Sequence, residues 1–404
     1  MNPKKGLLKV SDKLLSRSIL SVAPSATMAM TQLARDLKAQ GRDVIGLSSG
    51  ESDFDTPDHI GEAAAKAIKE GKTRYTAVDG IPELKDAIIE KFKRENNLTY
   101  SAAEINVSPG GKPVIFNALA VTLNPGDEVI IPAPCWVSYP GMVSLLGATP
   151  VVVPCDAASN FRLSAEVLEA AITPKTKWLM LNSPSNPTGS AYSGDDLKAL
   201  AEILRRHPDI LILSDDIYEH LIYGGFQFAT LASVAPDLKD RILTMNGVSK
   251  AYAMTGWRIG YAGGPAWLIK AMAKYMGQTT SNPTSISQWA AVAALNGPQD
   301  FITEARKAYD ARRVNIVKSI NSMKGLSCRK PEGAFYAFFS CQALLGRPYK
   351  SDADFTMALL EATGVALVPG SAFHAPGFVR LSYAADPKLL EEACRRLNAF
   401  CEEL

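Results

Sequence analysis

Lys250 stands in a glycine-rich stretch, GVSKAYAMTGWRIGYAGG at residues 247–264, and Arg258 follows in the same stretch. A lysine that faces water needs no such setting. A lysine that must reach a reactive group in a crowded pocket does, because glycines let the backbone approach a ligand closely. The stretch therefore points to a pocket in which the Lys250 amine meets a reactive group.

Further polar side chains follow apolar runs that are typical of buried strands. Asn186 lies in SPSNPTG (183–189), and Asp215 and Tyr218 end the next such run. Ligands of an open α/β sheet gather at the carboxyl ends of its strands. An amide, a carboxylate, a phenol and the Lys250 amine are therefore expected to converge there.

Gly110 and Gly111 open a predicted helix within SPGGKPVIFNALAVTL (108–123). The free N–H groups at such a helix start form an anion site.

Each of the five features, Lys250, Asp215, Gly110 with Gly111, Asn186 and Arg258, also has a simpler explanation when taken alone. The lysine would then be solvated, the aspartate would cap a strand end, and the two glycines would form only a turn. The Asn-Pro pair would only end regular structure in a loop, and the arginine would form a surface ion pair. The order and spacing of all five favour one site.

The elements that must position these residues alternate between strand and helix patterns. Strands are predicted near 126–134, 176–184, 209–218 and 240–247. The stretch 193–209 predicts a helix, with Ser193 as its N-cap and acidic residues in its first turn. This alternation indicates a largely parallel sheet covered on both faces.

The pattern changes after Pro298. A long helix (299–323), a strand (334–340), a helix near 353–362, two short apolar runs and a helix from Pro387 predict a smaller α+β domain. A helix near 28–40 is expected to pack with it. We therefore predict a large α/β domain at 51–297, and a small domain built from 1–50 and 298–404.

The composition of the 404 residues excludes several classes of protein. The net charge is +2 and no arginine-rich tract occurs, so neither nucleic acid nor a membrane surface is an expected partner. The six cysteines form no Cys-x-x-Cys pair, which argues against a metal site. The N-terminus lacks the apolar core of a signal peptide, and no run is long enough to span a bilayer. We expect a cytoplasmic protein.

Several stretches together resemble one family. They are LSSGESDFDTP (47–57), YTAVDGIPELK (75–85), PAPCWVSYP (132–140), NSPSNPTG (182–189), SDDIYE (214–219), SKAYAMTGWRIGY (249–261) and FVRLSYA (378–384). In this order they resemble the class I aminotransferases that depend on pyridoxal 5'-phosphate, especially bacterial aspartate aminotransferases and the related prephenate aminotransferases. The resemblance implies the type I fold of this superfamily, with a mostly parallel sheet between helices and a smaller α+β domain.

By this resemblance Lys250 forms an imine with the cofactor, and its amine, once displaced, moves a proton between the substrate Cα and the cofactor C4′. Arg258 binds the cofactor phosphate, which suits its planar guanidinium. Asp215 keeps the pyridine nitrogen protonated, so that the ring accepts electrons. Asn186 and Tyr218 bind the ring hydroxyl oxygen.

Two further cofactor contacts implied by the resemblance come from aromatic residues. Trp136 stacks on the ring face, and Tyr75 reaches the phosphate of a neighbouring subunit, which implies a homodimer with shared active sites. The resemblance places four more residues around the phosphate: Gly110, Gly111, Lys112 and Ser249.

Substrate recognition is implied in the same way. Arg380 matches the arginine that binds the substrate α-carboxylate, Gly50 supplies a backbone contact nearby, and Trp136 and Asn186 border the substrate. The second carboxylate of a dicarboxylic substrate is expected to meet Lys112, with Thr27 closing over it.

This last expectation comes from a departure from part of the family. Animal and enteric aspartate aminotransferases use an arginine lent by the partner subunit, whereas this chain has no arginine between Arg258 and Arg306. The stretch SNPTSISQW (281–289) occupies that region instead. A lysine is a point charge on a flexible stem and discriminates less sharply than an arginine, so a broader substrate range, prephenate included, is expected.

The leading functional hypothesis is transamination of L-aspartate with 2-oxoglutarate by a ping-pong mechanism. A C–S lyase acting by β-elimination, or an aminotransferase with aromatic or neutral substrates, remains an alternative on the same fold. A ligand-sensing regulator domain is disfavoured, since the resemblance starts near Leu15 and leaves no room for a DNA-binding module. A nicotinamide dehydrogenase is disfavoured because no Gly-x-Gly-x-x-Gly occurs.

Overall fold

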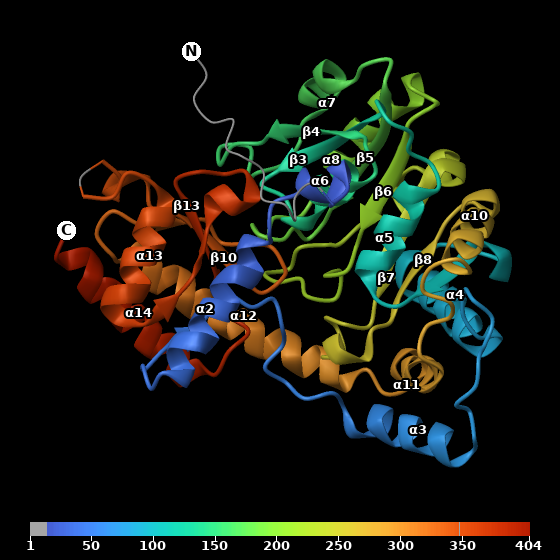
Figure 1. Ribbon diagram of the computed structural model, residues 1–404, viewed down its shortest axis with the longest axis horizontal. Helices are drawn as coiled ribbons and strands as arrows, with labels where there is room; N and C mark the ends of the chain where they lie inside the picture. The colour runs from blue at the N-terminus through green and yellow to red at the C-terminus, as the bar shows by residue number, and fades with distance from the viewer. Residues whose placement is uncertain (1–13, 347) are drawn as a thin grey trace.

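A seven-stranded sheet forms the centre of the computed structural model, which describes residues 14–346 and 348–404 (Figure 1). Its strand order is β2-β8-β7-β6-β5-β3-β4, and only β8 runs antiparallel to its neighbours. The strands are β2 (Ile105–Ser108), β3 (Glu128–Ala133), β4 (Thr149–Pro154), β5 (Thr176–Asn182), β6 (Leu211–Asp215), β7 (Ile242–Gly247) and β8 (Gly260–Gly263). The prediction of a mostly parallel sheet is confirmed.

Helices cover both faces of this sheet (Figure 1). Along β3, Ile130 belongs to one apolar cluster while Val129 and Ile131 belong to another, as the two-residue period of a strand requires. The helices of this part of the chain are α3 (Asp58–Lys69), α4 (Pro82–Asn96), α5 (Gly111–Ala120), α6 (Ser138–Leu145), α7 (Ala165–Ala171), α8 (Gly194–Arg206), α9 (Leu231–Val234), α10 (Ala266–Met276) and α11 (Ser285–Asn296). The predicted N-cap of α8 is also confirmed, because the Ser193 hydroxyl accepts the Asp196 N–H.

A second, antiparallel sheet with strand order β12-β13-β10-β9 lies in the C-terminal part of the chain. Its strands are β9 (Ser327–Cys328), β10 (Tyr336–Ser340), β12 (Val368–Pro369) and β13 (Phe378–Ser382), and the helices here are α12 (Asp300–Asn321), α13 (Asp352–Thr363) and α14 (Pro387–Glu402). Short 3-10 helices occur at Ala102–Glu104, Pro236–Arg241, Thr255–Trp257, Gln342–Leu344 and Gly370–Phe373.

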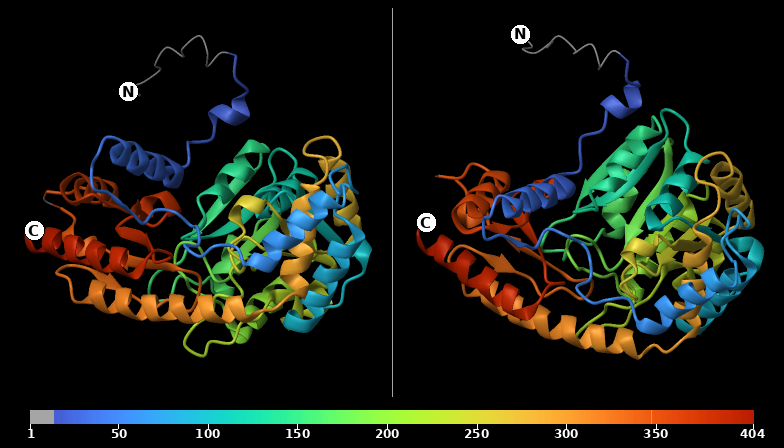
Figure 2. Two further views of the ribbon diagram at one scale, coloured as in Figure 1. Left: turned by 90° about the horizontal axis from the view of Figure 1, so that it is seen from below. Right: turned by 60° about the horizontal axis from the view of Figure 1, so that its bottom comes forward.

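The N-terminal helices are α1 (Arg17–Leu20) and α2 (Ala26–Ala39). Met30 and Ala34 of α2 pack against Leu360 and Ala366, and Figure 2 shows α2 beside the C-terminal elements. The strand β1 (Ile45–Gly46) adds a parallel pairing with β11 (Val365–Ala366). The expected packing of the N-terminal helix with the C-terminal part is therefore observed, while the exact domain bounds stay a prediction.

The strand register brings the ends of three strands level. Asn182 pairs with Asp215, and Asp215 pairs with Met245, at the carboxyl ends of β5, β6 and β7. The loops that follow these strands therefore start from one edge of the sheet, where an α/β fold gathers its ligands. Within the described ranges, no helix is long and apolar enough to cross a membrane.

Candidate active site

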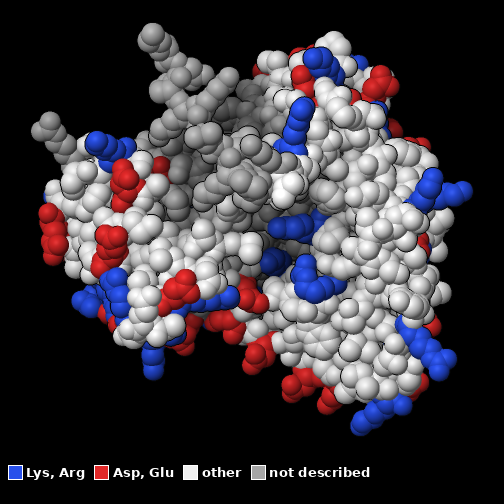
Figure 3. All heavy atoms as spheres, viewed as in Figure 1, with Lys and Arg blue, Asp and Glu red and all other residues white. Residues whose placement is uncertain are grey.

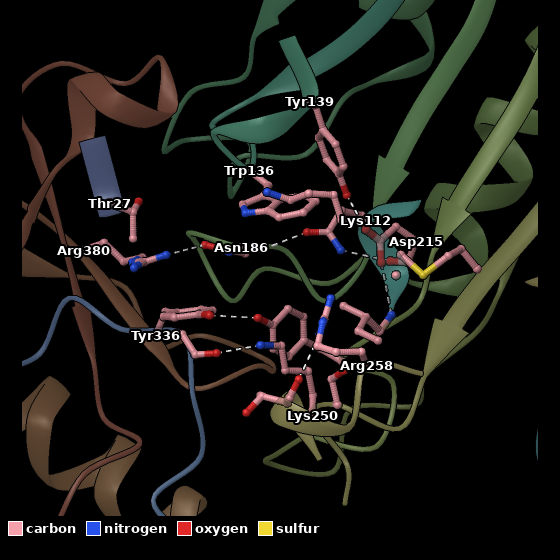
Figure 4. Close-up of a pocket in the computed structure, with 18 residues that line it drawn as sticks. Thr27, Lys112, Trp136, Tyr139, Asn186, Asp215, Lys250, Arg258, Tyr336 and Arg380 are labelled. Carbon is pink, nitrogen blue, oxygen red and sulfur yellow. Dashed lines mark hydrogen bonds between the residues drawn. The ribbon is translucent and has the colours of Figure 1, made fainter. Parts of the chain in front are cut away.

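A cavity of about 260 Å³ lies where this sheet edge meets β10, β13 and the first turn of α2 (Figure 4). Figure 3 shows a hollow on one face of the molecule with Lys and Arg side chains inside it. The cavity brings together every residue predicted for the site except Gly110 and Tyr75. Those that line it are Thr27, Gly50, Gly111, Lys112, Trp136, Asn186, Asp215, Tyr218, Ser249, Lys250, Arg258 and Arg380.

Lys250 follows β7 and projects into the cavity, where its Nζ donates a hydrogen bond to the Gly50 carbonyl at 2.6 Å. Burial lowers the pKa of the Lys250 amine to about 8, and the charges of Arg380 and Arg258 act in the same direction. A pKa near 8 leaves an appreciable fraction of the amine neutral at neutral pH, which a nucleophile or a general base requires.

Asp215 ends β6 and turns its carboxylate toward the cavity (Figure 4). Burial raises the pKa of this carboxyl to about 6, while hydrogen bonds favour its ionised form. The Tyr139 hydroxyl donates to Oδ2, and the Ile217 N–H donates to Oδ1 at 3.3 Å. The Asn182 amide fixes the strand end by donating to the Asp215 carbonyl at 2.9 Å.

Arg380 lies on β13 and is only 1% exposed. Its Nη1 donates to Asn186 Oδ1 at 2.8 Å, and its Nη2 donates to the Ser48 carbonyl at 2.5 Å. Among the described residues the acceptors of this guanidinium are neutral, and its buried Nε has no hydrogen-bond partner. Because a buried charge is costly unless it is paired, this arginine is a ready binding group for a carboxylate.

Glycines shape a cradle beside the N-terminus of α5. Gly110 has φ +105°, and a Cβ there would lie 2.2 Å from Arg258 Nη2. A Cβ on Gly260 would lie 2.3 Å from the Gly111 nitrogen. These glycines therefore allow the guanidinium and the free N–H groups of the helix start to share one space, which suits an anion such as a phosphate.

Lys112 and Thr27, the two residues expected to receive a second carboxylate, both line the cavity. Lys112 Nζ is 4.9 Å from the centre of the Trp136 ring. Burial lowers the pKa of Lys112, and the nearby charge of Arg258 lowers it further. The Thr27 hydroxyl comes from the first turn of α2 and has no hydrogen-bond partner within residues 14–346 and 348–404.

Tyr75 lies outside the cavity and is 91% exposed on this chain. Its expected contact is with another subunit, so its role stays a prediction. Gly110 does not line the cavity directly but precedes the residues that do. The roles assigned to the other site residues likewise remain predictions.

Six residues that line the cavity are missing from the predicted set. They are Tyr139, Asn182, Ile217, Met245, Thr255 and Tyr336. The first five lie within or directly beside the motifs and strand ends already singled out, so proximity along the chain was an available signal. Tyr336 comes from β10, and its hydroxyl lies 2.8 Å from that of Tyr218, a contact that only the packing of the two sheets reveals.

Comparisons with known proteins first define the class of this chain. The sequence profile of the family described as "Aminotransferase class I and II" matches residues 42–397. The chain belongs to this family and is an aminotransferase, which confirms the predicted family, fold class and type of enzyme.

Comparison with individual relatives shows which members of this family the chain resembles. The chain is 58% identical to a probable aspartate/prephenate aminotransferase of Rhizobium leguminosarum bv. phaseoli, over 96% of this chain and 98% of the relative. It is 55% identical to the aspartate/prephenate aminotransferase of Cereibacter sphaeroides, over 96% and 99% of the two chains. The crystal structure of the Rhizobium meliloti aspartate aminotransferase matches with a TM-score of 0.94 at 53% identity, covering 96% and 98%.

Proposed function

We propose that this protein transaminates L-aspartate with 2-oxoglutarate by a ping-pong mechanism, using pyridoxal 5'-phosphate, and that it also accepts prephenate. The observation that carries the proposal is Arg380, a buried cation that has only neutral acceptors among the described residues and lines the same cavity as Lys250. The names of the relatives, aspartate and aspartate/prephenate aminotransferases, support the choice of substrates.

The residues present fit pyridoxal 5'-phosphate. The glycine-lined cradle with Arg258 suits its phosphate, and the Asp215 carboxylate suits its ring nitrogen. Lys250, with its lowered pKa, suits its aldehyde. When bound, the cofactor supplies a carbonyl carbon for amines and an electron sink for the substrate α-carbon.

The protein's own groups would then orient the substrate and move its proton. Arg380 binds the α-carboxylate, and its free Nε supplies a donor that the protein leaves unused. Asn186, which already accepts from Arg380, holds that guanidinium in place. The neutral form of the Lys250 amine would take the proton from the substrate α-carbon as a general base, and the resulting ammonium would give it to the cofactor C4′ as a general acid. A pKa of about 8 suits both roles near neutral pH.

Lys112 and Thr27 complete the proposal for a dicarboxylic substrate. Both line the cavity, and the Thr27 hydroxyl lacks a partner within the described part of the chain. A substrate held by cations at both ends is oriented along one axis, which favours reaction through positioning. The larger acidic substrate prephenate fits the same scheme, since Lys112 is a flexible point charge.

Two further features belong to this proposal. The exposure of Tyr75 supports a homodimer in which this side chain reaches the partner's cofactor phosphate. The six cysteines form no disulfide in the structure, which supports a reducing compartment such as the cytoplasm. We also propose the division into a small domain, built from 1–50 and 298–404, and a large domain at 51–297; residues 1–13 of the small domain lie outside the described ranges.

The absorption spectrum of the purified, cofactor-loaded protein tests the function. We expect added L-aspartate, without a keto acid, to convert the bound cofactor to its amine form, and 2-oxoglutarate to reverse the change. A cofactor band that aspartate leaves unmoved would overturn the substrate assignment. Turnover of cystathionine without any keto acid would instead favour a lyase.

A further inference from the structure

Tyr139 was not predicted as part of the site, yet its hydroxyl donates directly to Oδ2 of Asp215 (Figure 4). We propose that Tyr139 is a positioning residue that keeps the Asp215 carboxylate ionised and aimed at the ring nitrogen of the cofactor. The inference rests on the proposed function, because it requires that Asp215 faces that nitrogen.

The surroundings of Tyr139 fix the orientation of its side chain toward Asp215. It is 2% exposed and lies in the first turn of α6, with its N–H donating to the Trp136 carbonyl at 3.0 Å. The Tyr139 and Trp136 rings meet edge to face with centroids 5.4 Å apart. Trp136, just before α6, and Tyr139, in its first turn, therefore place the aromatic wall of the cavity and the donor to Asp215 on one short stretch of chain.

A donor at this point has a clear chemical effect. Burial disfavours the charged form of Asp215, whereas a hydrogen bond donated to the carboxylate favours it. If Asp215 became protonated, it would no longer stabilise a protonated ring nitrogen. Tyr139 is the one side chain that donates to this carboxylate within the described ranges; the other donor is the backbone N–H of Ile217.

Tyr139 is suited to act as a permanent donor. Its burial and the charge of Asp215 hold the pKa of its phenol well above the usual value, so the hydroxyl keeps its proton. The other titratable groups facing Asp215 are Lys250, whose charge favours the carboxylate, the neighbouring Asp216, and the phenol of Tyr218. None of these forms a hydrogen bond to the Asp215 carboxylate in the described structure.

The competing explanation is that Tyr139 only fills the core. It packs in an apolar cluster with Cys135, Met142 and Val143. Under that explanation, loss of the hydroxyl lowers stability but leaves the ionisation of the bound cofactor and its affinity unchanged. These readouts separate the two roles.

The test compares the holoenzyme with Tyr139→Phe by pH titration of the cofactor absorption, cofactor dissociation constant and kcat. We expect Tyr139→Phe to weaken cofactor binding and lower kcat by about tenfold to a hundredfold, the usual range for a hydrogen bond to a charged group. The acid limb of the titration should move to higher pH, because the Asp215 carboxyl then protonates more easily. Tyr139→His, which retains an N–H donor, should recover part of the loss.

Tyr223→Phe is the matched control, since Tyr223 is 3% exposed, donates its hydroxyl to the Ala334 carbonyl and does not line the cavity. It should lose stability without shifting the titration. Failure of the wild-type protein to bind pyridoxal 5'-phosphate would defeat the proposed function itself. A wild-type protein that binds it, with a Tyr139→Phe variant of equal cofactor affinity and titration, would overturn only the role of Tyr139. If Tyr139→Phe does not fold, Tyr139→His carries the test. A folded Tyr139→His variant whose cofactor absorption no longer titrates with pH would overturn the inference.

Discussion

Two buried cations in this molecule have opposite surroundings. Lys91 of α4 is fully buried and pairs with the Glu219 carboxylate, which also accepts from the Asn96 amide at 2.6 Å and the Asn246 amide at 2.7 Å. Arg380 is equally buried but has only neutral acceptors among the described residues. The first charge is neutralised by the protein, and the second is left for a ligand.

The difference separates a structural charge from a binding charge. Glu95, Glu219 and His220 lie close enough together to suggest a metal site, yet the Lys91 ammonium already lies against both carboxylates and supplies the positive charge. A metal ion is not needed to neutralise these two carboxylates. Arg380, by contrast, borders a cavity and keeps an unused donor, so its charge gains a partner only when a carboxylate enters.

Removal of Arg380 should have the largest effect on function. We expect Arg380→Ala to lower kcat/KM for L-aspartate by roughly 10²- to 10⁴-fold, since a buried charge pair with the substrate is lost. The free energy of unfolding should change little, because removal of an unneutralised buried charge offsets the loss of two buried hydrogen bonds and of side-chain volume. Steady-state kinetics of this variant measure the change in kcat/KM, and urea unfolding measures the change in its unfolding free energy. A variant that loses several kcal/mol of stability while keeping its KM would show that Arg380 is structural.

Removal of Lys91 should produce the reverse pattern. We expect Lys91→Met to lose about 3–5 kcal/mol of unfolding free energy, because Glu219 is left buried without its cation. The KM for aspartate should stay near that of the wild type. The double variant Lys91→Met with Glu219→Gln is the matched control, and it should recover most of the stability. Equal instability of the single and double variants would contradict the pairing.

This contrast also marks what could be predicted from the sequence. Lys250, Asp215 and Asn186 were found because each follows a strand whose apolar run is visible in the chain, and the parallel sheet brings such ends together. The order of the strands was not predicted, because it depends on packing between segments far apart in the sequence. Local pattern therefore supplied part of the cavity, whereas the family resemblance supplied the other predicted residues that line it, namely Gly50, Lys112, Trp136, Ser249, Arg380 and Thr27.

What the sequence could not predict was the state of each charge. Lys91 and Arg380 are both basic residues in the chain, and nothing in their neighbours along the sequence separates the paired one from the unpaired one. Glu219 is distant from Lys91 in sequence, and Tyr336 is distant from Tyr218. Pairings of this kind exist only once the two sheets and their helices have packed.

Asp216 extends the comparison to a buried acid outside the cavity. Its Oδ1 accepts from the Ser214 hydroxyl at 2.8 Å, whereas its buried Oδ2 has no partner in the described part of the chain. Burial raises the pKa of Asp216 to about 8. Between the ordinary pKa near 4 and this value the folded protein binds the extra proton, so stability falls as pH rises, by up to about 1.4 kcal/mol per pH unit.

We therefore expect Asp216→Asn to stabilise the protein at pH 8 by roughly 1–3 kcal/mol, and to have little effect at pH 4. Urea unfolding at the two pH values measures the change. Greater destabilisation at pH 8 than at pH 4 would mean that Asp216 is ionised and paired when folded. The expected result would show that burial keeps the Asp216 carboxyl protonated, so that its unpartnered oxygen, which does not line the cavity, is explained without a ligand.

Lys112 offers the smallest and sharpest test of the comparison, because it is a cation that borders the cavity without the deep burial of Arg380. Water screens such a charge, so we expect Lys112→Ala to raise the KM for L-aspartate by only about fivefold to tenfold. The KM for L-alanine, which lacks a second carboxylate, should not change. Equal losses for both amino acids would assign Lys112 to the cofactor phosphate instead, which its place beside Gly111 at the start of α5 also allows. Arg380→Ala should weaken both substrates alike, because each has an α-carboxylate, so the two variants together assign one cation to each end of the substrate.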